Sequence, residues 1–343
     1  MLSKRHVIGL FAGLVLSATG AAAQDKTKIK FTLDWKYQGI HAFVFWAADK
    51  GYFAAEGLDV EIDQGTGSAA TVTRIVSGTY DAGLGDVNAI IQYAGTKPGD
   101  QPKMVYMLYN TPPFALIVKN DSPIKTLKDM EGKTLGAPAG AATGQLFPAL
   151  AKLNGIDASK VSITSMAPNL QEQMLVQGQV DVSGIFTVTS YINLVGMKVN
   201  PDKDIRWFYF SDYGIDLYSN GVMVSAKLLA EKPKAVAGLV KALNRALIET
   251  AANPDAAIAG MMKVEPLMNA ALEKQRLTYA LNQHFVSKET DEIGMGDIKD
   301  ERMARSIKLL VDTYNLPNTP KVSDIFDRSA MPPKSERILK LAK

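Results

Sequence analysis

Aromatic and polar side chains suited to ligand binding gather early in the chain, where Asp34, Trp35 and His41 lie within eight residues. Tryptophan can offer a flat face to an aromatic ligand, and carboxylate and imidazole groups can exchange hydrogen bonds with ligand N–H groups. Each residue also has a structural interpretation: Trp35 as a core residue, Asp34 as a turn residue and His41 as a hydrogen-bonded helix residue. The polar neighbours Lys36 and Gln38 favour a loop, and therefore a ligand contact, for Trp35.

Two glycine-rich loops that precede predicted helices form a second candidate binding element. They are residues 65–68 (Gly-Thr-Gly-Ser) and residues 138–144 (Pro-Ala-Gly-Ala-Ala-Thr-Gly). Glycine lets a backbone approach a ligand closely, free N–H groups at a helix start favour negative charge, and Ser68 can cap its helix. Both loops also fit plain helix starts, and the second lacks the Lys-Ser/Thr ending of a Walker loop. The candidate ligand contacts from these loops are Gly67, Ser68, Ala139, Gly140 and Thr143.

The sequence contains no pattern typical of catalysis or of metal binding. No G-x-S-x-G elbow precedes a helix, no paired carboxylates stand out, and cysteine is absent. The three histidines (His6, His41 and His284) are scattered, and without cysteine they do not make a metal site. We therefore expect a binding protein and not an enzyme, with no cofactor and no metal.

The elements that position these residues alternate between strand and helix patterns, which is typical of an α/β fold with mostly parallel sheets. Helical periodicity dominates from Ala226 onward and is clearest over residues 233–252. The predicted strands are residues 28–33, 58–62, 80–84 and 104–108, and the helices predicted between them are residues 41–50 and 68–77.

A weak internal repeat relates residues 75–81 to residues 175–181, each a helix end, a glycine and a strand start at or beside an aspartate. Such an echo can arise by chance, but two copies of one βαβα plan predict two similar lobes. Ligands bind beyond the carboxyl ends of strands in such sheets, so residues after the repeated strands should face each other across a cleft. The candidates after the repeated strands are Asp86, Asn88 and Phe186. Tyr109 and Tyr213, near the expected crossings between the lobes, are two further candidates.

The N-terminus has the three-part pattern of a secretory signal peptide. A basic segment at residues 4–6 precedes apolar residues 7–16, and small residues follow up to Ala23. Ten apolar residues are too few to span a membrane, which takes about 20. We expect residues 1–23 to be a signal peptide that is removed on export to the periplasm.

The charge and composition of the exported chain argue against a nucleic-acid partner, a disulfide framework and a lipid anchor. Loss of Lys4 and Arg5 reduces the formal charge from +3 to +1, and the charges are interspersed. A nucleic-acid partner would require a basic patch or stripe. The absence of cysteine also removes a disulfide framework and a lipid-attachment site.

A set of short segments in a specific order and spacing covers most of the chain. They are residues 33–35, 41–42, 48–53, 56–60, 65–68, 76–78 with Asp81, 122–133 and 252–254. Together these segments resemble the substrate-binding proteins of importers for alkanesulfonates, taurine, nitrate and thiamine-pyrimidine precursors. The Leu-Asp-Trp segment followed by His41 is most similar to the thiamine-precursor branch.

The resemblance implies a type II periplasmic binding protein fold. In this fold two lobes, each with a central, mainly parallel sheet flanked by helices, are joined by a two-strand hinge. Lobe 1 would comprise residues 24–113 and 220–343, and lobe 2 residues 114–219. The hinge strands would be Phe114–Lys119 and the stretch around Asn220–Val224.

The resemblance also implies the solute-binding component of an ABC importer, acting as a monomer with a small-molecule ligand and the importer permease with its ATPase as partners. The favoured ligand is a small nitrogen heterocycle, such as a pyrimidine related to thiamine, stacked on Trp35. The alternative is an aliphatic sulfonate, taurine or nitrate bound at Gly67 and Ser68. A pyrimidine synthase of the same fold carries a cysteine-rich iron motif that this chain lacks, and a receptor-linked sensor is a further alternative.

Overall fold

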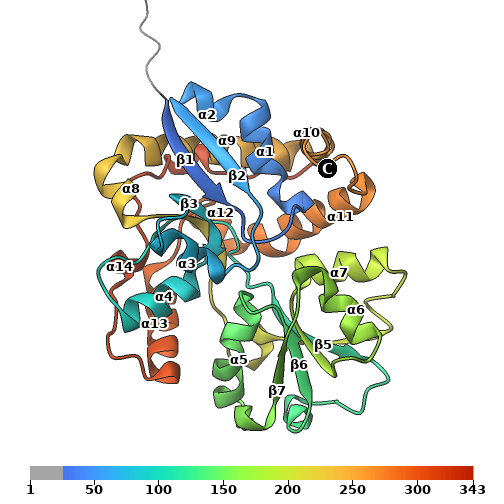
Figure 1. Cartoon of the computed structure of the whole chain (residues 1–343). Coiled ribbons are helices and arrows are strands. Elements are labelled where there is room, and N and C mark those ends of the chain that lie inside the picture. Colours follow the sequence, from blue (N-terminus) through green and yellow to red (C-terminus); the bar gives the residue numbers. More distant parts are fainter. Residues whose placement is uncertain (1–25, 343) are drawn as a thin grey trace, which may run out of the picture.

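The computed structural model describes residues 26–342, so the predicted signal peptide, residues 1–23, lies outside the described residues. The described part contains two five-stranded sheets surrounded by helices, one above the other in Figure 1. None of its helices combines the length and the apolar character needed to cross a membrane.

The first sheet has the strand order β2-β1-β3-β10-β4. β1 (Thr27–Thr32) lies parallel to β2 (Leu58–Asp63) on one side and to β3 (Ala82–Asp86) on the other. β10 (Asn220–Val224) runs antiparallel between β3 and β4 (Lys103–Met107). The four strands predicted in this region are confirmed to within two residues at each end.

Helices pack around the first sheet, and the longest of them is α9 (Pro233–Ala252). Its apolar residues from Val236 to Leu247, spaced three and four apart, are buried, and α1 (Ala42–Asp49) lies against it. The helix predicted over residues 233–252 is therefore confirmed. The other helices here are α2 (Tyr52–Ala55), α3 (Ala70–Val76), α4 (Val87–Thr96), α8 (Ala226–Glu231), α10 (Pro254–Met261), α11 (Ala270–Ala280), α12 (Lys288–Ile293), α13 (Asp300–Tyr314) and α14 (Val322–Ile325).

The second sheet has the strand order β7-β6-β8-β5-β9. β6 is parallel to β7 and β8, whereas β5 is antiparallel to β8 and β9. Its strands are β5 (Phe114–Lys119), β6 (Thr134–Ala137), β7 (Ser162–Ser165), β8 (Val182–Phe186) and β9 (Ile205–Tyr209), and its main helices are α5 (Ala142–Leu153), α6 (Gln171–Val176) and α7 (Thr187–Gly196).

The two sheets share one plan, because β2-β1-β3-β10-β4 corresponds strand by strand to β7-β6-β8-β5-β9. The aspartates of the sequence repeat have the same role in each copy. The Asp81 carboxylate accepts from the N–H of Lys30, 2.9 Å away, and the Asp181 carboxylate accepts from the N–H of Thr134, also at 2.9 Å. In both copies the aspartate ties the start of the third strand to the first strand, so the repeated motif is structural. The predicted α/β class with two similar sheets is confirmed.

The chain passes twice between the sheets, through residues 108–113 and residues 210–219. The strands that we expected to form the hinge do not make these crossings. β5 and β10 begin directly after them, and each pairs on both sides within a single sheet. The segments that precede these strands connect the sheets, so the two strands expected to form the hinge begin where the crossings end.

We propose that the molecule divides into two lobes, one around each sheet. Lobe 1 is residues 24–113 and 220–343, and lobe 2 is residues 114–219. All strands of the first sheet belong to lobe 1, and all strands of the second sheet belong to lobe 2.

Candidate functional site

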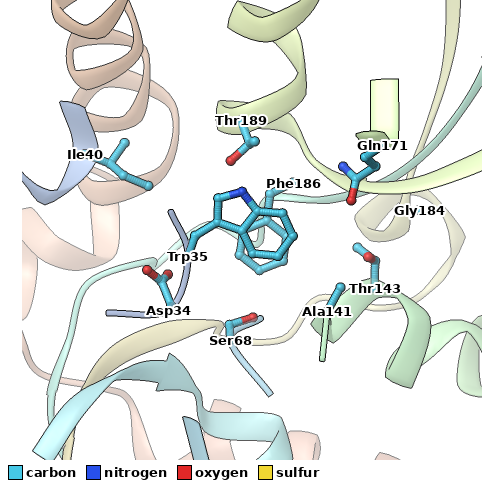
Figure 2. A pocket seen from close by; sticks show the side chains of 10 residues that line it. All are labelled: Asp34, Trp35, Ile40, Ser68, Ala141, Thr143, Gln171, Gly184, Phe186 and Thr189. Atoms are coloured by element: carbon cyan, nitrogen blue, oxygen red, sulfur yellow. The ribbon is translucent and has the colours of Figure 1, made fainter. Parts of the chain in front are cut away.

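A cavity lies between the lobes, beyond the carboxyl ends of β1, β6 and β8, which is where α/β sheets bind ligands. Both lobes contribute to its wall (Figure 2). The lining residues are Asp34, Trp35, Ile40 and Ser68 from lobe 1, and Ala141, Thr143, Gln171, Gly184, Phe186 and Thr189 from lobe 2. The candidates predicted from the sequence that the cavity brings together are Asp34, Trp35, Ser68, Thr143 and Phe186.

The indole of Trp35 projects into the middle of the ring of lining residues (Figure 2). The empty space among these residues is about 380 Å³, but only about 20 Å³ of it can hold the centre of a water molecule. That is room for about one water. A ring-shaped ligand therefore requires Trp35 to turn or the lobes to separate slightly.

Asp34 forms the floor of the cavity and is held by two donors. Its Oδ1 lies 2.8 Å from Nε2 of His41, and its Oδ2 accepts from Nδ2 of Asn220 at 2.5 Å. The Nδ1 atom of His41 accepts from the N–H of Gln38, so the imidazole proton is on Nε2 and is donated to Asp34. Burial alone would raise the pKa of Asp34, but the hydrogen bonds from His41 and Asn220 hold the pKa below its usual value. The cavity floor is thus an ionised carboxylate at neutral pH.

His41 and Tyr109 lie beneath this floor rather than in the cavity wall. Together with Asp34 and Asn220 they line a smaller internal space under it. The Tyr109 hydroxyl is buried and has no hydrogen-bond partner among the described residues. Burial raises the pKa of Tyr109 well above its usual value. His41 supports Asp34 directly, whereas the Tyr109 ring packs on Phe285 and Phe186. Neither residue lines the cavity itself.

The glycines of the two loops contact each other across the cleft. The N–H of Ala69 donates to the carbonyl of Gly140 at 3.1 Å, and a Cβ added at Gly67 would overlap the backbone of Gly140. Ser68 is buried in the cavity wall but does not cap α3, whose first turn follows Ala69. The predicted cap is therefore wrong. Ala139 is exposed and does not line the cavity.

The remaining candidates lie away from the cavity. The Asp86 carboxylate caps α4, accepting from the backbone N–H of Asn88 at 3.3 Å and from its Nδ2 at 2.8 Å. The same Nδ2 donates to the carbonyl of Tyr218, next to a crossing. Burial raises the pKa of Asp86 to about 7. Tyr213 packs on Phe208 inside lobe 2.

Five lining residues were not predicted from the sequence, namely Ile40, Ala141, Gln171, Gly184 and Thr189. Thr189 is in the first turn of α7, immediately after β8. Ligands bind beyond the carboxyl ends of strands, and this rule, which predicted Phe186, could also have predicted Thr189. Gln171 begins α6, where no sequence signal separates a lining residue from an ordinary helix start.

Asp34 is the one ionisable side chain among the described residues that line the cavity. Thr143 adds a buried hydroxyl that has no partner within the described residues. In residues 26–342 no group of three or more His, Cys, Asp or Glu side chains is placed to hold a metal ion. The cavity therefore offers an aromatic face, one carboxylate and neutral polar groups.

Comparison with known proteins places this chain in a family. Residues 38–257, more than half of the chain, match the family described as NMT1/THI5 like. The chain belongs to this family. The family resemblance expected from the sequence is thereby confirmed, including its thiamine-precursor side.

Proteins similar to this chain include two that are named for binding and one that is named as a synthase. The riboflavin-binding protein RibY of Chloroflexus aurantiacus is 26% identical over 73% of this chain and 70% of its own length. The formylaminopyrimidine-binding protein of Halalkalibacterium halodurans is 25% identical over 75% of this chain and 78% of its own. A Legionella pneumophila relative named 4-amino-5-hydroxymethyl-2-methylpyrimidine phosphate synthase is 23% identical over 88% of this chain and 96% of its own.

Solved structures confirm the fold predicted from the sequence. The alkanesulfonate-binding protein SsuA of Xanthomonas axonopodis pv. citri superposes with a TM-score of 0.67 over 89% of this chain and 99% of its own, at 14% identity. This NMT1/THI5-like chain thus has the periplasmic binding protein fold.

Proposed function

We propose that the chain is the solute-binding component of an ABC importer and that it captures a small nitrogen heterocycle between its lobes. The ligand class includes pyrimidines such as those for which the H. halodurans relative is named, and the flavin for which RibY is named. The protein would act as a monomer in the periplasm and deliver its ligand to the permease and its ATPase.

One observation carries this proposal: Trp35 projects between the lobes directly beside the ionised Asp34. A flat ring can stack on the indole while its N–H groups donate to the carboxylate, which accepts strong, charge-assisted hydrogen bonds. Thr143 and Gln171 on the opposite wall can complete the ring's polar edge. The ligand would then contact both lobes and favour their closure.

The charge of the lining argues against a sulfonate, taurine or nitrate. No lysine or arginine is found among the described lining residues, and an anion would lie close to the Asp34 carboxylate. Ser68 and loop N–H groups alone would have to offset that repulsion. Anions are therefore the alternative ligand class. A binding experiment that compares anions with heterocycles can decide between the two classes.

We propose a binding protein rather than an enzyme, although relatives named as synthases exist. Relatives of comparable similarity are named as binding proteins. The 343-residue sequence has no cysteine, so it does not contain the cysteine-rich iron motif expected of the synthase.

The test is a ligand panel on the mature protein, residues 24–343, freed of bound small molecules by unfolding and refolding. A ligand at a hundredfold excess over its Kd stabilises the folded state by about 2.7 kcal/mol. We expect 4-amino-5-hydroxymethyl-2-methylpyrimidine, its formylamino relative or riboflavin to raise the melting temperature, with affinity then measured by calorimetry. Stabilisation by taurine, ethanesulfonate or nitrate, with none by the heterocycles, would replace this ligand class with anions.

A further inference from the structure

Arg276, on α11 of lobe 1, is buried at the boundary between the lobes, with 3% of its surface exposed. All five of its N–H groups are engaged. Two are donated to the carboxylate of Glu273 on the same helix, at 3.0 and 3.2 Å. The acceptors in lobe 2 are the carbonyls of Val188 and Thr189, at 3.1 and 2.6 Å, and Oδ1 of Asn193, at 2.9 Å.

The hydrogen-bond partners of Arg276 are connected to residues in or next to the cavity wall. In lobe 1, Glu273 accepts from the N–H of Gly39 at 2.6 Å, next to the lining residue Ile40. In lobe 2, Thr189 is itself a lining residue, and its hydroxyl donates to Oε1 of Gln38 at 3.1 Å. Both walls of the cavity are therefore fixed to one guanidinium group.

A second set of bonds extends this connection within lobe 2. Asn193 donates to Oε2 of Glu172 at 3.1 Å, and the lining residue Gln171 donates to Oε1 of Glu172 at 3.3 Å. Glu172 is buried and also accepts from Ser190. Arg276 is thus connected to Gln171 through Asn193 and Glu172.

We propose that Arg276 is a positioning residue that holds the two lobes closed over the ligand. This inference rests on the proposed function, in which lobe closure captures the solute. Separation of the lobes breaks the three bonds to lobe 2, whereas the pair with Glu273 persists because both residues belong to α11. That pair keeps the planar guanidinium oriented for closure, so little side-chain entropy is lost when the lobe 2 bonds form.

The test compares Arg276→Met and Arg276→Lys with the unmodified mature protein, and uses Lys274→Met as a matched control. Lys274 is on the same helix but is exposed, and it pairs with Asp255 of lobe 1. Small-angle scattering of protein freed of bound small molecules measures lobe opening without any ligand. Stopped-flow dissociation, with a heterocycle shown to bind, measures the off-rate.

Without ligand, we expect Arg276→Met to have a larger radius of gyration than the unmodified protein and Lys274→Met. The off-rate of Arg276→Met should rise at least tenfold with an on-rate changed less than threefold, and Arg276→Lys should be intermediate. Equal scattering and equal off-rates for Arg276→Met and the unmodified protein would overturn the proposal. So would an unmodified protein already as open as the variant.

Two features keep the test decisive. If no heterocycle binds, the proposed ligand class fails, but scattering still decides whether Arg276 holds the lobes together. If Arg276→Met does not fold, Asn193→Ala removes one lobe 2 acceptor and leaves the guanidinium paired with Glu273. That variant should open partially, and scattering unchanged from the unmodified protein would count against the proposal.

Discussion

At the residue scale, the indole of Trp35 is placed where a ligand ring would stack. We expect Trp35→Ala to weaken heterocycle binding by about 1 to 2 kcal/mol, the size of an aromatic pair with some lost burial. Stability should change little, because the side chain is only half-buried and lies at the cleft. Calorimetric titration and thermal unfolding measure the two effects, and Trp35→Phe should retain most of the affinity. A large loss of stability with unchanged affinity would make Trp35 a core residue.

The carboxylate of Asp34 should select ligands by their N–H groups. Asp34→Asn keeps the size of the side chain but removes the charge that His41 and Asn220 stabilise. Hydrogen bonds to charged groups contribute about 1.5 to 3 kcal/mol, so we expect affinity for an N–H-bearing heterocycle to fall at least tenfold at neutral pH. The exposed Asp59→Asn on β2 is the control. Equal heterocycle affinity for Asp34→Asn and the unmodified protein would remove Asp34 from the site.

The sequence predicted the central residues of the site, Trp35 and Asp34, but not Gln171 or Arg276. Trp35 and Asp34 stood out because polar neighbours mark a loop after a strand. His41 and Tyr109 have residue types that suit ligand contact, yet both line the smaller space beneath the cavity and not the cavity itself. Gln171 and Arg276 depend on contacts between segments about a hundred residues apart, which local spacing does not reveal.

At the element scale, the two glycine loops determine how closely the lobes approach. Gly67 has a φ of +151°, and a side chain there would overlap Gly140. We expect Gly67→Ala to prevent full closure and to reduce ligand affinity at least tenfold, with a stability loss on the order of 1 kcal/mol from the unfavourable backbone conformation. Calorimetry and small-angle scattering measure affinity and closure.

The matched control for Gly67 is Gly144→Ala, which changes a glycine in the first turn of α5, just after the second loop. An added Cβ there meets only Ala137 of its own lobe, at 3.3 Å. Affinity and scattering should therefore stay close to those of the unmodified protein. If Gly67→Ala bound and closed as well as Gly144→Ala, the loop contact would not limit closure.

The strands and helices of the fold followed from their periodicity, but the crossings did not. β5 and β10 have the apolar character of any buried strand. Which sheet each one joins depends on pairing partners such as β8 and β3, which lie 60 to 140 residues away in the chain. The family resemblance implied a hinge at these strands, and the structure shows that the chain crosses between the sheets in the segments just before them.

At the scale of the whole molecule, two buried groups should give opposite pH dependences of stability. Burial lowers the pKa of His284 to about 4 and raises the pKa of Asp86 to about 7. Between pH 4 and about 6.5 the unfolded chain binds the histidine proton more tightly, so this group makes stability rise with pH. From about pH 4 to 7 the folded chain binds the aspartate proton more tightly, so that group makes stability fall with pH. The two contributions, about 3 kcal/mol for His284 and about 4 kcal/mol for Asp86, have opposite slopes and largely cancel over the interval that they share.

Single substitutions should therefore expose a pH dependence that these groups conceal in the unmodified protein. His284→Gln can still bond Thr187 and Thr111 but leaves Asp86 unopposed, so its free energy of unfolding should decrease from pH 4.5 to 6.5. Asp86→Asn can still cap α4 but leaves His284 unopposed, so its free energy of unfolding should increase over the same interval. Urea unfolding at several pH values measures both slopes, relative to the unmodified protein because other groups are common to all three. Parallel curves for the three proteins would mean that neither group changes its proton affinity on folding.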